Sequence, residues 1–77
     1  MTISTIMSNS AWNKKIEILR IAKGWSQEEA AEHCGTNQKQ YWNWEKGKSF
    51  PRNNSQKAIA NAFGVPVSEI FPKEDTQ

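Results

Sequence analysis

Residues 27–46, QEEAAEHCGTNQKQYWNWEK, decide the fold of this chain, because they predict two short helices joined by one tight turn. Ala31 lies four residues after Gln27, where two helices approach so closely that a larger side chain would hold them apart. Gly35 follows Cys34 at the end of the first helix, where the chain must turn and a positive φ is usual. The positions that face inward are small or apolar, namely Ala30, Ala31, Cys34, Tyr41 and Trp44.

The outward face of the second predicted helix is polar and completes a helix-turn-helix pattern. Its residues are Asn37, Gln38, Lys39, Gln40 and Asn43. The face has amides and one cation, and no carboxylate occurs before Glu45. Because amides and cations are the groups that bind base edges and phosphates, we expect this face to contact DNA.

The distribution of charge supports this expectation better than the net charge does. A chain of 77 residues allows one domain with a modest core, and its net charge of +2 is mild. Between Gln38 and Arg52, however, one acid stands against four cations, which are Lys39, Lys46, Lys48 and Arg52. Glu28 and Glu29 lie on the preceding helix, where acids stabilise a helix N-terminus.

The apolar periodicity and the cap residues predict five helices and no strand. The expected ranges are about Ala11–Lys23, Gln27–Cys34, Gln38–Lys46, Ser55–Phe63 and a last short turn with Ile70 and Phe71. The expected N-caps, in the same order, are Ser10 or Asn9, Ser26 with Glu29 in a capping box, Asn37 or Thr36, and Ser68 for the last turn. We expect a flexible arm over 1–10, in which Met7 is a second possible start, a compact all-α domain over 11–72 and a flexible tail over 73–77.

Four tryptophans in a chain of this size need an explanation. Trp12, Trp25 and Trp44 lie at apolar-periodic positions, and core packing is the simplest interpretation. Trp42 is two residues from Trp44 and therefore faces away from the core. Two interpretations of Trp42 are equally good: its ring contacts a DNA sugar or thymine methyl, or it belongs to a partner interface.

No pattern in the chain indicates catalysis, a cofactor or a metal site. His33 and Cys34 are neighbours on a helix and point about 100° apart, with no further Cys or His to complete a metal site. A single cysteine excludes an internal disulfide and fits a reducing cytoplasm. No apolar stretch approaches the roughly 20 residues that span a membrane, and the first residues are not typical of a signal peptide.

The run IEILRIAKGWSQEEAAEHCGTNQKQYWNWEKGKSFPR, continued by AIANAFGVPVSEIF, resembles the Cro/C1-type helix-turn-helix family of phage repressors and bacterial regulators. The resemblance covers about residues 12–71 and is carried by LR before KGWSQEE, by the paired alanines, by Gly35 and by WEKGK before Pro51. It implies a five-helix, lambda-repressor-like domain whose third helix lies in the major groove. Ala30 and Cys34 are smaller than the family's usual leucines, and Trp12, Tyr41 and Trp44 are candidates to fill that volume.

The resemblance also implies roles for individual residues. Base reading would fall to Gln38, Lys39, Gln40 and Asn43, and backbone contacts to Lys46, Lys48 and Ser49. Gln27 would hold a phosphate and steady Gln38 on the recognition helix. Arg20 and Glu45 would form a partly buried pair that locks the first helix to the third. To the backbone contacts we add Asn37 and Arg52, from their positions beside the recognition helix.

These features predict a sequence-specific regulator that binds double-stranded DNA without a cofactor, as a homodimer on a palindromic operator. The sequence leaves open whether it is a phage repressor, a restriction–modification controller or an antitoxin. The alternative class is a protein-interaction module that keeps the fold but reads DNA weakly or not at all. We expect the dimer interface at Val67, Ile70 and Phe71, because a small domain has difficulty burying every apolar residue of this chain against itself.

Overall fold

The computed structural model describes residues 11–71, and within this range the chain forms five helices and no strand. The helices are α2 (Trp12–Lys23), α3 (Gln27–Cys34), α4 (Gln38–Glu45), α5 (Asn53–Phe63) and α6 (Val67–Ile70). The predicted all-α, five-helix architecture is confirmed. The predicted arm over 1–10, with its caps Asn9 and Ser10, and the predicted tail over 73–77 lie outside the described residues.

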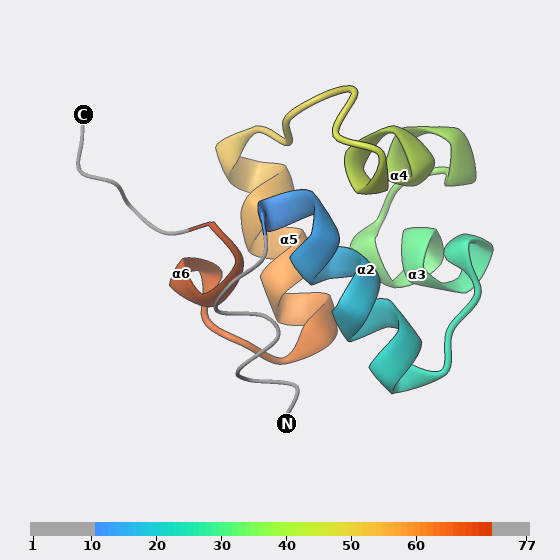
Figure 1. Ribbon diagram of the computed structural model, residues 1–77, viewed down its shortest axis with the longest axis horizontal. Coiled ribbons are helices and arrows are strands. Elements are labelled where there is room, and N and C mark those ends of the chain that lie inside the picture. Colours follow the sequence, from blue (N-terminus) through green and yellow to red (C-terminus); the bar gives the residue numbers. More distant parts are fainter. Residues whose placement is uncertain (1–10, 72–77) are drawn as a thin grey trace.

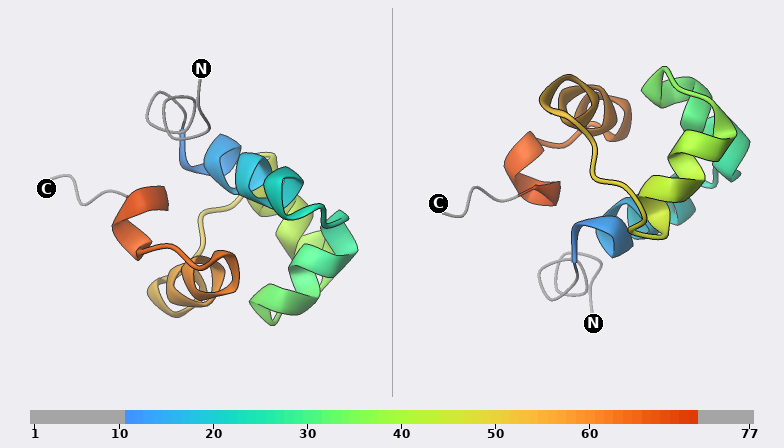
Figure 2. Two further views of the ribbon diagram at one scale, coloured as in Figure 1. Left: turned by 90° about the horizontal axis from the view of Figure 1, so that it is seen from below. Right: turned by 90° about the horizontal axis from the view of Figure 1, so that it is seen from above.

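Helix α2 connects the two halves of the fold. It packs against α4 on one side and against α5 and α6 on the other, while α3 contacts both α4 and α5. Figure 1 shows α3 and α4 at the opposite end of the molecule from α6, with α2 crossing in front of α5. The two views in Figure 2 show the same division, and the segment between α4 and α5 passes along one side of the domain. The helix-turn-helix therefore lies at one end of the domain, with the outer face of α4 uncovered.

The ends of the two motif helices follow the predicted local chemistry. Ser26 Oγ accepts a hydrogen bond from the Glu29 backbone N–H, and the Glu29 side chain accepts one from the Ser26 N–H, which completes the capping box. Asn37 Oδ1 accepts a 2.8 Å hydrogen bond from the Gln40 N–H and caps α4. Gly35 has a φ of 75°, so the turn uses the left-handed conformation that glycine adopts without strain.

Three predicted helix starts differ from the observed ones. Helix α2 begins after Ala11, which makes no side-chain cap. Helix α5 begins at Asn53 rather than Ser55, and the Gln56 side chain donates a hydrogen bond back to the Pro51 carbonyl. Helix α6 begins at Val67 after Pro66, so the prediction that Ser68 caps this helix is wrong. These three starts are poorly marked in the sequence because none of them has a side-chain cap.

The core is built around large side chains from α2, α4 and α5. Ile16, Tyr41 and Ile59 are fully buried, and Trp44 is 2% exposed. Ala30, Ala31 and Cys34 belong to the same cluster. Tyr41 and Trp44 therefore share the core with Ala30 and Cys34, and Trp12 is partly buried and packs against the same cluster. The Trp12 ring lies at the other end of α2, 5.8 Å from the Phe71 ring.

The expectation that Ile70 and Phe71 remain for a second subunit is wrong for the described monomer. Ile70 is 0% exposed and Phe71 is 7% exposed, so both belong to the core of a single chain. Helix α6 folds back onto α5 and α2, and this packing covers the two side chains. Val67 stays half-buried, and Phe50, which sequence analysis had not assigned to an interface, is 59% exposed. The exposed large apolar side chains within residues 11–71 are Ile21, Trp42 and Phe50, and Phe50 is the one that lies on the same groove as Val67.

Candidate nucleic-acid interface

Glu45, at the end of α4, is the centre of a polar network that fixes this helix. Its carboxylate accepts a 2.6 Å hydrogen bond from Arg20 Nε on α2 and a 3.1 Å bond from Gln27 Nε2 on α3. Arg20 also donates to the Trp25 carbonyl at 2.9 Å. The expected pair of Arg20 and Glu45 thus occurs, and Glu45 links all three helices around the motif.

Burial makes this pair stronger than an ordinary surface ion pair. The Glu45 side chain is 4% exposed and that of Arg20 is 16% exposed. Burial alone would lower the pKa of the Arg20 guanidinium, but the hydrogen bond and the charge of Glu45 outweigh it and raise the pKa above its usual value. The raised pKa keeps the Arg20 guanidinium charged beside the Glu45 carboxylate.

Gln27 makes a contact that the family resemblance did not imply. Its amide nitrogen binds Glu45 rather than Gln38, because Gln27 opens α3 beside the buried end of α4. Gln27 and Lys46 line one shallow cleft of about 280 Å³. Any phosphate contact by Gln27 would be made from this cleft, at the positive end of the α3 dipole.

Asn13 is a positioning residue that sequence reasoning missed. Its Nδ2 donates a 3.1 Å hydrogen bond to the backbone carbonyl of Glu45, which satisfies one of the free carbonyls at the end of α4. The same amide lies against Gly47, where an added Cβ would come within 3.3 Å of Asn13 Nδ2. No local pattern connects Asn13 to residues 32 positions away, so this contact becomes visible only in the folded chain.

The predicted base-reading residues lie on the uncovered face of α4. Gln38, Lys39 and Gln40 are exposed and Asn43 is half-buried. Asn37 is exposed but uses its side-chain oxygen to cap the helix. The two core aromatics of the helix, Tyr41 and Trp44, point to the other side. The helical spacing of polar and apolar residues along α4 therefore separates a packing face from a solvent face, as predicted.

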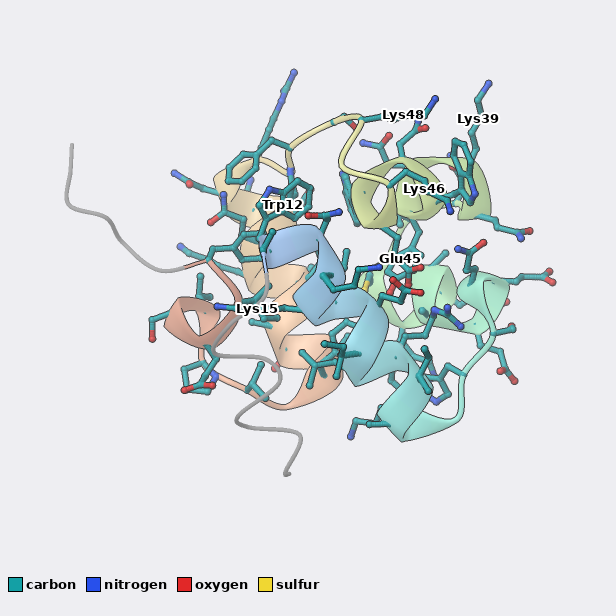
Figure 3. All side chains as sticks on the ribbon, in the orientation of Figure 1. Trp12, Lys15, Lys39, Glu45, Lys46 and Lys48 are labelled. Carbon is teal, nitrogen blue, oxygen red and sulfur yellow. The ribbon has the colours of Figure 1, made fainter. Side chains whose placement is uncertain are left out.

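The four predicted cations also stay in solvent. Lys39, Lys46, Lys48 and Arg52 are all exposed, and Figure 3 shows the three lysines around α4 at the same end of the domain. Glu45, the one acid between Gln38 and Arg52, is buried beneath this surface and paired with Arg20. The surface around α4 therefore offers amides and cations with no exposed carboxylate from that segment, a chemistry suited to phosphates and base edges.

Ser49 and Trp42 differ from the other predicted contact residues in their surroundings. The Ser49 hydroxyl is buried and has no hydrogen-bond partner among the described residues, so a DNA contact by Ser49 would have to come from its main chain. Trp42 is 37% exposed, whereas Trp44 is 2% exposed, which confirms that the two rings face opposite sides of α4. The ammonium groups of Lys46 and Lys48 lie over the Trp42 ring.

The other two conspicuous residues of α3, His33 and Cys34, take part in packing. The His33 ring stacks on Trp25 with centroids 3.9 Å apart, and the Trp25 ring also stacks on Phe63. Cys34 is buried, and burial raises the pKa of its thiol to about 11. Within residues 11–71, no three His, Cys, Asp or Glu side chains gather in a way that could hold a metal ion.

Comparison with known proteins identifies the class to which this fold and surface belong. A family model described as a helix-turn-helix domain matches residues 13–76. Because the match covers most of the chain, this protein belongs to that helix-turn-helix family, and the Cro/C1-type resemblance is confirmed. No solved structure gives a significant match.

Two curated relatives are similar to the chain over nearly the same region. One is the HTH-type transcriptional activator BcrR of Enterococcus faecalis, 33% identical over 83% of this chain and 31% of its own length. The other is the cryptic phage CTXphi transcriptional repressor RstR of Vibrio cholerae, 31% identical over 84% of this chain and 59% of its own length. The chain thus spans 31% of the length of the first relative and 59% of the second. No helix within residues 11–71 has the length and apolar character to cross a bilayer.

Proposed function

We propose that this protein is a transcriptional regulator, acting as a repressor, that binds double-stranded DNA in a sequence-specific manner with α4 in the major groove. One observation carries the proposal. The solvent face of α4 and the following turn present amides and cations, while Glu45 is buried and neutralised. Membership of a helix-turn-helix family and relatives named as transcriptional regulators support it.

In this proposal the residues around α4 divide into two groups. Gln38, Lys39, Gln40 and Asn43 read base edges, because side-chain amides bind adenine and lysine binds guanine in the major groove. The backbone contacts come from Gln27, Asn37, Lys46, Lys48, Arg52 and the main chain of Ser49. These contacts set the position of α4 on the duplex and carry no sequence information of their own.

We further propose that the protein acts as a homodimer on a palindromic operator, in the cytoplasm. One copy of α4 reaches only a few base pairs, and two half-sites about 34–36 Å apart would supply the missing specificity. The surface that supports a two-fold contact is a groove of about 490 Å³ whose apolar lining is Phe50, Val67 and Phe71, beside polar residues that include Asn53, Gln56 and Lys57. Phe50 is exposed and Val67 is half-buried, so Val67 stays an interface candidate and Phe50 takes the place of Ile70 and Phe71.

Selection of bound sequences from a random duplex pool, followed by binding measurements over a range of salt concentrations, tests the proposal. We expect an enriched sequence with two-fold symmetry and an affinity that falls steeply with salt, because phosphate contacts release counterions. A pool without enrichment, together with weak and salt-insensitive binding, would contradict the proposal.

The second candidate function is a protein-interaction module or antitoxin that keeps the fold with weak DNA reading. The observation that favours it is the exposed Trp42 ring in the middle of α4, since large exposed aromatics often mark protein contacts. Under this alternative the selection experiment would return no preferred sequence.

A further inference from the structure

The Trp42 ring lies between the proposed base-reading face and two of the proposed phosphate contacts. Lys46 Nζ is 5.8 Å and Lys48 Nζ is 5.3 Å from the centroid of this ring. Both distances are within the range at which an ammonium is attracted to an aromatic face. One exposed ring therefore lies beside two cations from different segments, Lys46 at the end of α4 and Lys48 in the turn that follows.

Two lysines held in this way differ from two free surface lysines. A lysine has a flexible four-carbon stem and normally loses much of its freedom when its ammonium binds one phosphate. The Trp42 ring attracts both ammonium groups and so restricts both stems, and the C-terminal end of the α4 dipole favours Lys46 at the same place. The pair is thus arranged before a ligand arrives.

We propose that Trp42 is a positioning residue for DNA backbone binding, whose ring holds Lys46 and Lys48 as a paired phosphate clamp at the end of α4. The inference rests on the proposed DNA-binding function and assigns the role of Trp42 within it. Phosphates of the DNA backbone supply the negative charge that the two ammonium groups bind. The contribution of Trp42 is therefore independent of base sequence and passes through the two lysines.

A direct contact between Trp42 and DNA would behave differently. A ring that stacks on a sugar or covers a thymine methyl makes its own contact, and its contribution survives removal of the lysines. Coupling between Trp42 and the lysine pair therefore separates the two roles, and a double-mutant cycle measures that coupling.

The experiment uses the full chain and a fluorescein-labelled duplex of mixed sequence, with affinity read from anisotropy at fixed salt. Trp42→Leu is measured alone, and again in a chain with Lys46→Gln and Lys48→Gln. We expect Trp42→Leu alone to weaken binding about three- to tenfold, and to have almost no further effect in the chain without the two lysines. Trp42→Phe, which keeps a smaller aromatic face, is expected to lose less than Trp42→Leu.

Lys39→Gln provides the matched control, because Lys39 is an exposed lysine of the same helix and is not among the cations over the Trp42 ring. Trp42→Leu should cost the same in that background as in the wild-type chain. Equal losses with and without Lys46 and Lys48 would overturn the clamp, as would a Trp42→Leu chain that binds as tightly as wild type. A wild-type chain that binds no duplex would instead contradict the proposed function itself. Circular dichroism checks that each variant remains folded.

Discussion

Arg20 Nε lies 2.6 Å from Glu45 Oε2, and this ion pair joins the middle of the fold to the helix proposed to enter DNA. The two residues are 25 positions apart in the chain. Glu45 also accepts the Gln27 amide, and its own carbonyl accepts the Asn13 amide, so side chains from α2 and α3 hold the end of α4. The orientation of α4 therefore depends on Glu45, whose buried carboxylate has two donors and whose backbone carbonyl has a third.

Arg20→Ala should destabilise the protein strongly, because it leaves the nearly buried Glu45 carboxylate without its counter-charge. We expect a loss of about 3 kcal/mol in the free energy of unfolding, or a melting temperature lower by roughly 10 °C or more. Lys14→Ala is the matched control, since it removes an exposed ion pair to Glu17 that should contribute at most ~1 kcal/mol. Equal melting temperatures for the two variants would show that the Arg20 pair contributes little.

Gln38→Ala and Arg52→Ala should impair DNA binding in different ways. Loss of Gln38 should relax base preference at one operator position by roughly 1–3 kcal/mol, while binding to random duplexes changes little. Loss of Arg52 should weaken specific and random duplexes alike and flatten the salt dependence by about one unit. Competition binding with selected and random duplexes measures both effects. If Gln38→Ala weakened both duplexes equally, its base-reading role would be excluded.

Phe50→Ser should impair dimerisation and leave the monomer folded, because the Phe50 side chain is 59% exposed. Phe71→Ser should unfold the chain instead, because Phe71 is 7% exposed and packs its ring on Trp12 and Phe50. Sedimentation at micromolar concentration and thermal melting distinguish the two outcomes. The dimer proposal fails if the wild-type chain stays monomeric both free and on its operator.

The stability of the protein should fall as the pH rises from about 9 to about 11. Burial raises the pKa of Cys34 from 9.0 to about 11, so in this window the unfolded chain loses the thiol proton while the native chain keeps it. Fewer protons bound to the unfolded state means that rising pH favours unfolding, by about 1.4 kcal/mol for each unit of pKa difference. Burial also raises the pKa of Tyr41, which acts in the same direction.

Cys34→Ala isolates the contribution of the thiol to this alkaline loss. Urea unfolding of the wild-type and Cys34→Ala chains across the same pH range should show a shallower decline for the variant, with the remaining slope due to other groups such as Tyr41. Parallel declines for the two chains would show that the thiol is not protected by burial.

The helix-turn-helix and its solvent face could be predicted because their signals are local. The side chains of Ser26 and Asn37 cap their helices by accepting hydrogen bonds from backbone N–H groups three residues further along the chain. Gly35 ends α3 because glycine adopts a positive φ without strain. The spacing of Tyr41 and Trp44 determines which side of α4 is buried, and so which side carries Gln38 and Trp42. Each of these inferences needs only helical geometry and the chemistry of nearby residues.

The placement of Gln27, Asn13 and α6 could not be predicted in the same way. Gln27 binds Glu45 rather than Gln38, and Asn13 reaches the end of α4, because packing brings the ends of three helices together. Ile70 and Phe71 looked available for a partner because part of their cover comes from α2, which is far away in the chain. The sequence shows that lysines follow Trp42, but only the structure gives the distances that place Lys46 and Lys48 over its ring.

The amino-acid sequence by itself determined the number and type of the helices, the turn between α3 and α4, and the polar face that α4 offers to solvent. Periodicity, caps and glycine turns act over three or four residues and need no knowledge of the final packing. Only the tertiary structure decided that Glu45 also binds the side chains of Gln27 and Asn13, that α6 packs on α2 and α5, and that Phe50 is left exposed. These properties depend on contacts between distant segments, whose burial and charge balance exist only once the chain has folded.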